Sequence, residues 1–305
     1  MNFDDRAYVP VQGLGILTAR TLSNSHPTLL SILAADMSVL DVGCGPGTLT
    51  AEIARRVDPG AVVGMDANPE MIRAAEAASP PGSIPNLVFY TGDILDSSWH
   101  GEFDVVNAAR TLQWIPDPDA ALRRMALAAA PGGLVVVLDF DHTRAEWSDP
   151  PKAWMRFYAA FLAWREAGGL DNAIARRLHA LAESAGLVTI QLRQQVTTVR
   201  AGDADFFRVA GLWRMVTESR GRQMVAAGQI TDDERSAALD AFTEWMTQPD
   251  ATQTTHEACL VARRPEPSRP EALSQGARGS HEASSLPAQT SHLRGAGTSG
   301  GERAE

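Results

Sequence analysis

The stretch Val39-Leu40-Asp41-Val42-Gly43-Cys44-Gly45-Pro46-Gly47-Thr48 decides the fold of this 305-residue chain. An apolar run and an acid lead into three glycines, and Leu49, Ile53 and Val57 then follow at helical spacing. The pattern predicts a buried strand, a tight turn and a helix. Glycines in the turn free the backbone for unusual dihedral angles and allow a ligand to approach closely. In open α/β sheets, ligands bind at such strand ends.

Strand and helix signals alternate from residue 39 to residue 138. Short apolar runs at 39–42, 61–65, 87–90, 103–107 and 134–138 predict strands, and the segments 48–57, 69–78 and 119–130 predict helices between them. Strands that are apolar almost throughout are typical of a parallel sheet covered by helices on both faces. With right-handed crossovers, the pattern predicts a doubly wound α/β sheet.

The pattern changes after Asp141. Aromatic faces at 150–165 and 205–216 predict helices, a capping box at 231–234 opens another, and 174–185 predicts a helix that stops at Gly186. Two further strands are predicted at 187–199 and 254–262. The aromatic helix faces have two interpretations that the sequence leaves open: simple packing on the sheet domain, and a lid over a substrate pocket.

Composition favours a soluble globular protein in a reducing compartment. Hydrophobic residues make up 44% and charged residues 21%, and the net charge of −10 disfavours nucleic-acid binding. The two cysteines, Cys44 and Cys259, do not suggest a disulfide framework. The acidic N-terminus lacks the apolar core of a secretory signal, and no stretch approaches the roughly 18 apolar residues of a membrane span. We therefore expect a cytoplasmic protein with no membrane partner.

The glycine spacing departs from a dinucleotide-binding fingerprint, because the third glycine comes one residue early and Thr48 takes its expected place. Asp41, two residues before the turn, suits a ligand that carries positive charge, whereas a pyrophosphate would be repelled. The pattern D-x-G-x-G-x-G resembles the first motif of class I S-adenosylmethionine (SAM) methyltransferases. The alternative is a glycine turn that binds no ligand.

Further motifs extend the resemblance over about residues 36–140. Asp66, Asp93, the run 103–106 and the Pro131-Gly132-Gly133 turn follow in the family's order. The resemblance implies SAM as cofactor, with Asp66 on the ribose hydroxyls, Asp93 on the adenine amino group and Ile94 against the ring. Local capping or turn formation is the alternative role of each acid. The implied cofactor-binding residues are Asp41, Gly43, Cys44, Gly45, Gly47, Asp66, Ala67, Met71, Asp93, Ile94, Asn107 and Leu112.

The resemblance also implies a domain plan. The expected fold is α/β, a Rossmann-like, doubly wound, mostly parallel seven-stranded sheet in which the strand at 254–262 pairs antiparallel with that at 187–199. We expect a helical cap at 1–38 and a methyltransferase domain at 39–263, with substrate-lid insertions near 143–172 and 202–250. Residues 264–305 have almost no large apolar side chains, so we expect a disordered tail.

The segment Leu112-Gln113-Trp114-Ile115-Pro116-Asp117 bears on the methyl acceptor. Many small-molecule methyltransferases carry a histidine pair near this place, which this chain lacks. The form L-Q-W-x-P-D resembles carboxyl methyltransferases of small acids, of the trans-aconitate and malonyl-thioester type. Arg110 could hold a carboxylate through a bidentate pair, or lie at the surface, or contact the SAM carboxylate. A carboxylate acceptor needs no general base, whereas a neutral hydroxyl or amine does.

His142 is the candidate base, since histidine titrates in the working range; a solvated loop histidine is the alternative. Together with Arg110 and Gln113 it makes up the candidate catalytic set. The candidate substrate-binding residues are Trp114, Trp154, Tyr158, Asn172 and Trp213, and no metal site is expected.

The sequence therefore predicts a SAM-dependent methyltransferase that acts on a small-molecule acceptor, by O-methylation of a carboxylate or hydroxyl, as a monomer or homodimer. A quinone- or sterol-type C-methyltransferase and a non-catalytic SAM-binding protein are the alternatives. A nicotinamide oxidoreductase is disfavoured by the glycine spacing. The run Asn107-Ala108-Ala109-Arg110 lacks the N/D-P-P-Y/F signature of enzymes that methylate amino groups of nucleic acids.

Overall fold

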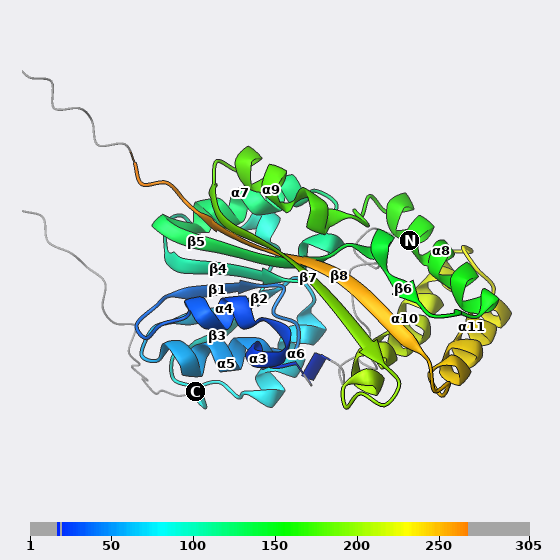
Figure 1. Cartoon of the computed structure of the whole chain (residues 1–305). Helices are drawn as coiled ribbons and strands as arrows, with labels where there is room; N and C mark the ends of the chain where they lie inside the picture. Colours follow the sequence, from blue (N-terminus) through cyan, green and yellow to red (C-terminus); the bar gives the residue numbers. More distant parts are fainter. Residues whose placement is uncertain (1–16, 19, 268–305) are drawn as a thin grey trace, which may run out of the picture. The chain divides into compact units, whose positions relative to one another are not determined.

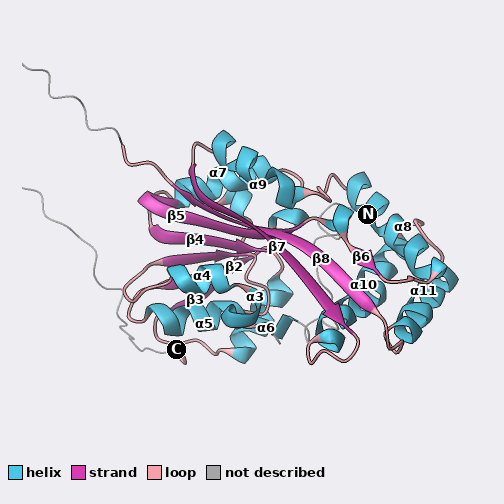
Figure 2. Ribbon diagram, viewed as in Figure 1, coloured by secondary structure: helices cyan, strands magenta, loops and turns pink. Residues whose placement is uncertain are grey.

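An eight-stranded sheet organises residues 17–18 and 20–267, which the computed structural model describes (Figure 1, Figure 2). Its strands are β1 (Val39–Val42), β2 (Val62–Asp66), β3 (Leu87–Thr91), β4 (Phe103–Ala109), β5 (Ala129–Phe140), β6 (Glu146–Trp147), β7 (Val188–Arg200) and β8 (Thr252–Arg263). The order is β3-β2-β1-β4-β5-β8-β6, and β7 pairs with the other edge of β8. The first five strands are parallel, and β8 is antiparallel to its three neighbours.

Alternation along the strands gives the sheet two apolar faces. Val39 packs with residues of α3 (Leu22–Ser25), α4 (Pro27–Ile32) and α5 (Thr48–Val57). Leu40, the next residue, packs with residues of α7 (Pro118–Ala128) and α9 (Ile174–Ser184). Figure 1 shows these two groups of helices on opposite sides of the strands, and α6 (Pro69–Ala78) contacts β2 and β3. The predicted doubly wound α/β architecture is confirmed.

The two longest strands, β7 and β8, extend beyond the end of β5 and lead to a second apolar cluster. β5 pairs with β8 as far as Glu257, while β7 stays paired with β8 to Thr252. Beyond that point lie α8 (Lys152–Ala167), α10 (Phe206–Ala226) and α11 (Asp232–Trp245), as Figure 2 shows. Their aromatic side chains pack into one buried cluster that includes Trp154, Trp213 and Phe242. Packing therefore accounts for most of the predicted aromatic helix faces.

The strand number differs from the predicted seven. The additional strand is β6, whose Glu146 and Trp147 pair with β8 where β5 has already ended. Two residues carry no periodicity, so the sequence gives no signal for this strand. The antiparallel pairing of β7 with β8 is confirmed. β5 begins at Ala129, before the expected Pro-Gly-Gly turn, and α10 continues to Ala226 rather than ending near residue 216.

The ends of the chain were predicted to be a helical cap and a disordered tail. In the cap region, α3 and α4 are described, whereas residues 1–16 and 19 lie outside the described part. In the tail, Arg264 is fixed to the sheet, since its backbone N–H donates to Gly133 and its Nη1 to the carbonyls of Leu127 and Ala129. Residues 268–305 lie outside the described part. Within the described part, no helix has the length and apolar character needed to traverse a bilayer.

Candidate functional site

A cavity of about 670 Å³ lies at the carboxyl ends of the parallel strands. The glycine turn after β1 and the segments that follow β2, β3 and β4 line it, together with α10 and residues near α3. Its position agrees with the general placement of ligands at strand ends of open α/β sheets. Of the predicted cofactor-binding residues, those that line the cavity are Asp41, Gly43, Cys44, Gly45, Asp66, Ala67, Met71, Asp93 and Ile94.

Two glycines of the turn have different surroundings: Gly43 lies close to Thr111, whereas Gly45 lies beside open space. Gly43 has φ +71°, its N–H donates to the Met65 carbonyl, and an added Cβ would lie 2.4 Å from Thr111. Gly45 has φ +55°, yet nothing lies within 4 Å of the position of its missing Cβ. Because Gly45 lines the cavity, this open space is where a ligand can contact the backbone.

Two carboxylates line the cavity at the carboxyl ends of β2 and β3. Asp66 accepts hydrogen bonds from the backbone N–H groups of Gly45 (2.9 Å) and Asn68 (2.8 Å), which fixes it against the glycine turn. Burial raises the pKa of Asp66 above its ordinary value. Asp93 accepts from the N–H of Leu95 and caps the short turn that carries Ile94. We call Asp66 and Asp93 the acidic end of the cavity.

Asp41 lies at the centre of a buried polar chain. It accepts from the Thr50 hydroxyl (2.7 Å) and from the Asn107 amide (2.8 Å), and the other end of that amide contacts His26 Nε2 (3.0 Å). Burial is the main cause that raises the pKa of Asp41 to about 6 and lowers that of His26 to about 3. Asp41 thus anchors α4 and α5 to β1 and also lines the cavity.

His142 and Gln113 form a hydrogen-bonded pair at the wall of the cavity. Gln113 Nε2 donates to the Arg110 carbonyl, so Gln113 Oε1 is the acceptor for His142 Nε2, 2.6 Å away. The Nε2–H tautomer of His142 follows, which leaves the lone pair on Nδ1. Burial, aided by the charge of Arg165, holds the pKa of His142 well below its ordinary value, so the ring is neutral at pH 7.

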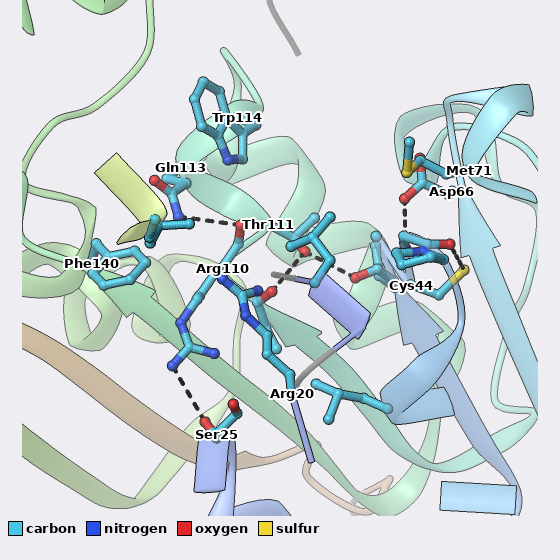
Figure 3. Close-up of a pocket in the computed structure, with 18 of the residues that line it drawn as sticks. Arg20, Ser25, Cys44, Asp66, Met71, Arg110, Thr111, Gln113, Trp114 and Phe140 are labelled. Atoms are coloured by element: carbon cyan, nitrogen blue, oxygen red, sulfur yellow. Dashed lines mark hydrogen bonds between the residues drawn. The ribbon is translucent and has the colours of Figure 1, made fainter. Parts of the chain in front are cut away.

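Arg110 follows β4 with a positive φ of 60° and lines the cavity. Its Nε donates to Glu257 at 2.6 Å. Its Nη2 donates to the Ser25 carbonyl at 3.4 Å, and Figure 3 shows this contact. Glu257 therefore accepts from one N–H of the guanidinium group, and a contact of Arg110 with a ligand carboxylate stays a prediction.

Six predicted site residues lie outside the cavity lining: Gly47, Asn107, Leu112, Trp154, Tyr158 and Asn172. Four of them pack against neighbouring elements or support them. Gly47 begins α5 and packs closely under Phe89, and Leu112 and Trp154 lie in buried apolar clusters. The Asn107 side-chain amide donates a hydrogen bond to Asp41.

Tyr158 and Asn172 act on the backbone of His142. The Tyr158 hydroxyl donates to the His142 carbonyl (2.6 Å), and the His142 N–H donates to the Asn172 carbonyl (2.8 Å). They therefore hold the candidate base in place without lining the cavity. Trp114 and Trp213, the other predicted substrate-binding residues, do line it.

Trp114 is held between two buried arginines. The guanidinium carbons of Arg165 and Arg220 lie 4.5 and 4.3 Å from the centroid of its rings. Arg165 also donates to the Gln113 carbonyl and to the Asn172 side chain, which connects α8 to the cavity wall. Sequence reasoning missed this support, because arginines on an aromatic helix face give no pattern that distinguishes buried from solvated cations.

The cavity also has a basic end, which sequence reasoning missed apart from Arg110. It consists of Arg20, Arg110, Arg208 and Arg220, all of which line the cavity. Figure 3 shows Arg20 beside Arg110, on the opposite side from Asp66. The strand order gives the same separation, because β1 lies between β2, which ends at Asp66, and β4, which precedes Arg110.

These features define a class of protein. An α/β sheet with a glycine turn open to a cavity, a buried acid below it and carboxylates after the next two strands suits a nucleoside that carries positive charge. The described residues fit SAM on these grounds: open space beside Gly45, carboxylates at Asp66 and Asp93, and negative charge near Asp41 for a sulfonium and ammonium.

Comparison with known proteins gives the same result. Residues 33–186 match a family model described as a methyltransferase domain. The chain is 31% identical over 220 residues to trans-aconitate 2-methyltransferase of Methylobacterium radiotolerans, which covers 69% of this chain and 78% of that protein. It is 38% identical over 99 residues to trans-aconitate 2-methyltransferase of Deinococcus radiodurans, which covers 32% of this chain and 36% of that one.

A solved structure shares the fold. Phosphoethanolamine N-methyltransferase 2 of Haemonchus contortus, in complex with phosphomonomethylethanolamine and S-adenosylhomocysteine (SAH), superposes with a TM-score of 0.55 at 15% identity. The match covers 87% of this chain and 61% of that one. The chain belongs to the class I SAM-dependent methyltransferases, and SAM is its cofactor.

Proposed function

We propose that this enzyme transfers the methyl group of SAM to a carboxylate of a small organic acid. The separation of charge within one cavity carries the proposal: carboxylates line the end that suits the donor, and four arginines line the other end. That basic end occurs in a chain of net charge −10, so it is a local feature of the cavity. The relatives named as trans-aconitate 2-methyltransferases support the same acceptor class.

For methyl transfer from SAM to a carboxylate, the main task of the protein is to align the two reactants. The sulfonium supplies a methyl group with a good, neutral leaving group, and the acceptor oxygen must lie opposite the sulfur at about 3–3.5 Å. A carboxylate is already ionised at neutral pH, so no side chain has to remove a proton. His142 agrees with this requirement, because a ring with a lowered pKa is a weak base. Trp114, Phe161 and Trp213 supply apolar walls that exclude water.

Methylation of a hydroxyl is the second candidate, and the tautomer of His142 is the observation that favours it. Since His142 Nε2–H donates a hydrogen bond to Gln113, Nδ1 carries no proton and could accept one from a hydroxyl. C-methylation and SAM binding without catalysis have no comparable feature in the cavity.

The variant His142→Gln separates the two candidates. We expect kcat with acid acceptors to fall less than about 10-fold, whereas a general base contributes roughly 100- to 10,000-fold. The measurement is mass-spectrometric detection of methylated products from a panel of small acids and phenols. Loss of more than about 100-fold, with unchanged SAH binding, would contradict the carboxylate proposal.

Donor binding should depend on pH through Asp41. Burial raises its pKa to about 6, so the carboxyl is protonated below that pH, and the attraction for a cationic donor is then lost. SAH lacks the sulfonium charge but keeps the ammonium group, so we expect its affinity to fall up to about tenfold per pH unit below pH 6. By the same shift, the contribution of Asp41 to folding stability is present below about pH 4 and is lost as pH rises through 6.

The variant Asp41→Asn isolates this effect. Its fold should persist, because the Asn107 amide can turn over and His26 can exchange tautomers to keep the chain of hydrogen bonds. Calorimetric titration with SAH from pH 5 to 8 should show weaker binding without the pH step. Asp96→Asn, at an exposed position outside the cavity, is the matched control. A pH step that persists in Asp41→Asn would contradict the assignment.

A further inference from the structure

The arginines at the basic end differ in how their charges are compensated. Arg110 is paired with Glu257 at 2.6 Å, and Arg208 with Asp205 at 3.0 Å. Arg220 lies against the Trp114 ring and donates to Gln223. For Arg20, no carboxylate among the described residues lies within ion-pair distance of the guanidinium group, although it lines the cavity.

Arg20 is also surrounded by like charge. Burial is the main cause that lowers its pKa to about 9, and the charges of Arg110 and Arg208 lower it further, with Glu257 as the opposing contribution. Glu257 is already bound by Arg110, so it does not compensate Arg20 fully. A guanidinium group that is partly withdrawn from water and lacks its own counter-ion is unfavourable unless another group supplies the negative charge.

We propose that Arg20 and Arg208 form a carboxylate-binding subsite, which holds a second acid group of the acceptor that is not methylated. This inference rests on the proposed function and adds to it that the acceptor carries at least two carboxylates. Guanidinium groups bind carboxylates through charge-assisted hydrogen bonds of defined geometry. Arg20 precedes α3 and Arg208 lies on α10, so the two residues are far apart in the sequence.

The position of Arg208 favours the acceptor over the donor. Arg208 belongs to α10, which also presents Leu212 and Trp213 to the cavity, in the segment predicted to cover the substrate. The donor has a single carboxylate. The basic end has four guanidinium groups, and Glu257 is the one buried carboxylate among them. A mono-acid acceptor would leave Arg20 and Arg208 without a ligand.

The test uses the full chain saturated with SAH and calorimetric titration with three probes of increasing charge: butyrate, glutarate and tricarballylate. We expect affinity to rise with the number of carboxylates. Arg20→Gln should weaken tricarballylate binding about 10-fold or more, and should leave butyrate and SAH binding within about twofold. Arg208→Gln, a change at a partly exposed side chain, should act in the same direction. Arg73→Gln, on the exposed face of α6, is the control and should change none of these values.

Two results would overturn the subsite. In the first, Arg20→Gln weakens SAH as much as tricarballylate, which would assign the arginine to the donor carboxylate. In the second, tricarballylate binds no more tightly than butyrate. Measurement of methyl transfer keeps the two proposals apart: tricarballylate binding that depends on Arg20, with no methyl ester formed from any acid, would remove the proposed carboxylate methylation and leave the subsite intact.

Discussion

A chain that carries Gly45→Leu is expected to fold but to bind SAH at least about 100-fold more weakly, a loss of about 2.7 kcal/mol. Nothing lies within 4 Å of the Cβ position at Gly45, so the new side chain meets no protein atom near its base. It would instead enter the cavity beside Asp66, whose carboxylate accepts from the Gly45 N–H. The expected effect is therefore on the ligand and not on the core.

Gly82→Leu provides a control matched in backbone conformation. Gly82 has φ +83° and open space at its Cβ, but it lies outside the cavity lining. Both substitutions should lower the free energy of unfolding by a similar amount, roughly 1–2 kcal/mol for a left-handed backbone. Urea unfolding and SAH titration of the two variants measure this. Unimpaired SAH binding by Gly45→Leu would show that the donor does not lie against the glycine turn.

Arg165→Met should reduce the free energy of unfolding by about 3 kcal/mol or more. The side chain of Arg165 is fully buried, and its removal leaves the Gln113 carbonyl and the Asn172 side-chain oxygen without donors. The pKa of Asp139, raised by burial to about 7, should rise further, because the charge of Arg165 opposes that shift. The stability contribution of Asp139 is lost as pH rises through 7, so the variant should be affected most above neutral pH.

Arg156→Met, on the exposed face of the same helix, is the control for Arg165→Met and should change stability by less than about 0.5 kcal/mol. Urea unfolding at pH 6 and pH 8 gives both comparisons. Equal, small effects of the two substitutions would mean that the Arg165 network does not support the cavity wall.

The fold could be predicted largely from local patterns. Val39 and Leu40 show why: β1 is short and apolar on both faces, and this pattern indicates a parallel sheet covered on both sides before any pairing is known. The antiparallel pairing of β7 with β8 was expected from the family resemblance rather than from periodicity. β6 could not be foreseen, because its two residues become a strand only when β8 extends beyond β5.

The cofactor half of the site could also be predicted, since Gly45, Asp66 and Asp93 follow strands at fixed spacing and converge for topological reasons. Of the acceptor half, Arg110, Trp114 and Trp213 could be predicted to line the cavity, but the other arginines of the basic end could not. Arg20 lies about ninety residues before Arg110 and far from Arg208 along the chain, and only the tertiary fold brings their charges together. Trp154 was predicted to bind substrate but lies in a buried cluster. The sequence pattern of an aromatic residue on a helix face is the same whether the side chain faces a ligand or the core.

Transfer of a ¹³C-labelled methyl group from SAM to a panel of mono-, di- and tricarboxylic acids and phenols tests the central claim most directly. Mass spectrometry, before and after mild alkali, identifies the bond that has formed. The account predicts a labelled product from a polycarboxylic acid that alkali converts back to the free acid with loss of the label. A labelled product that survives alkali, as an aryl ether or a C-methyl compound does, would contradict it.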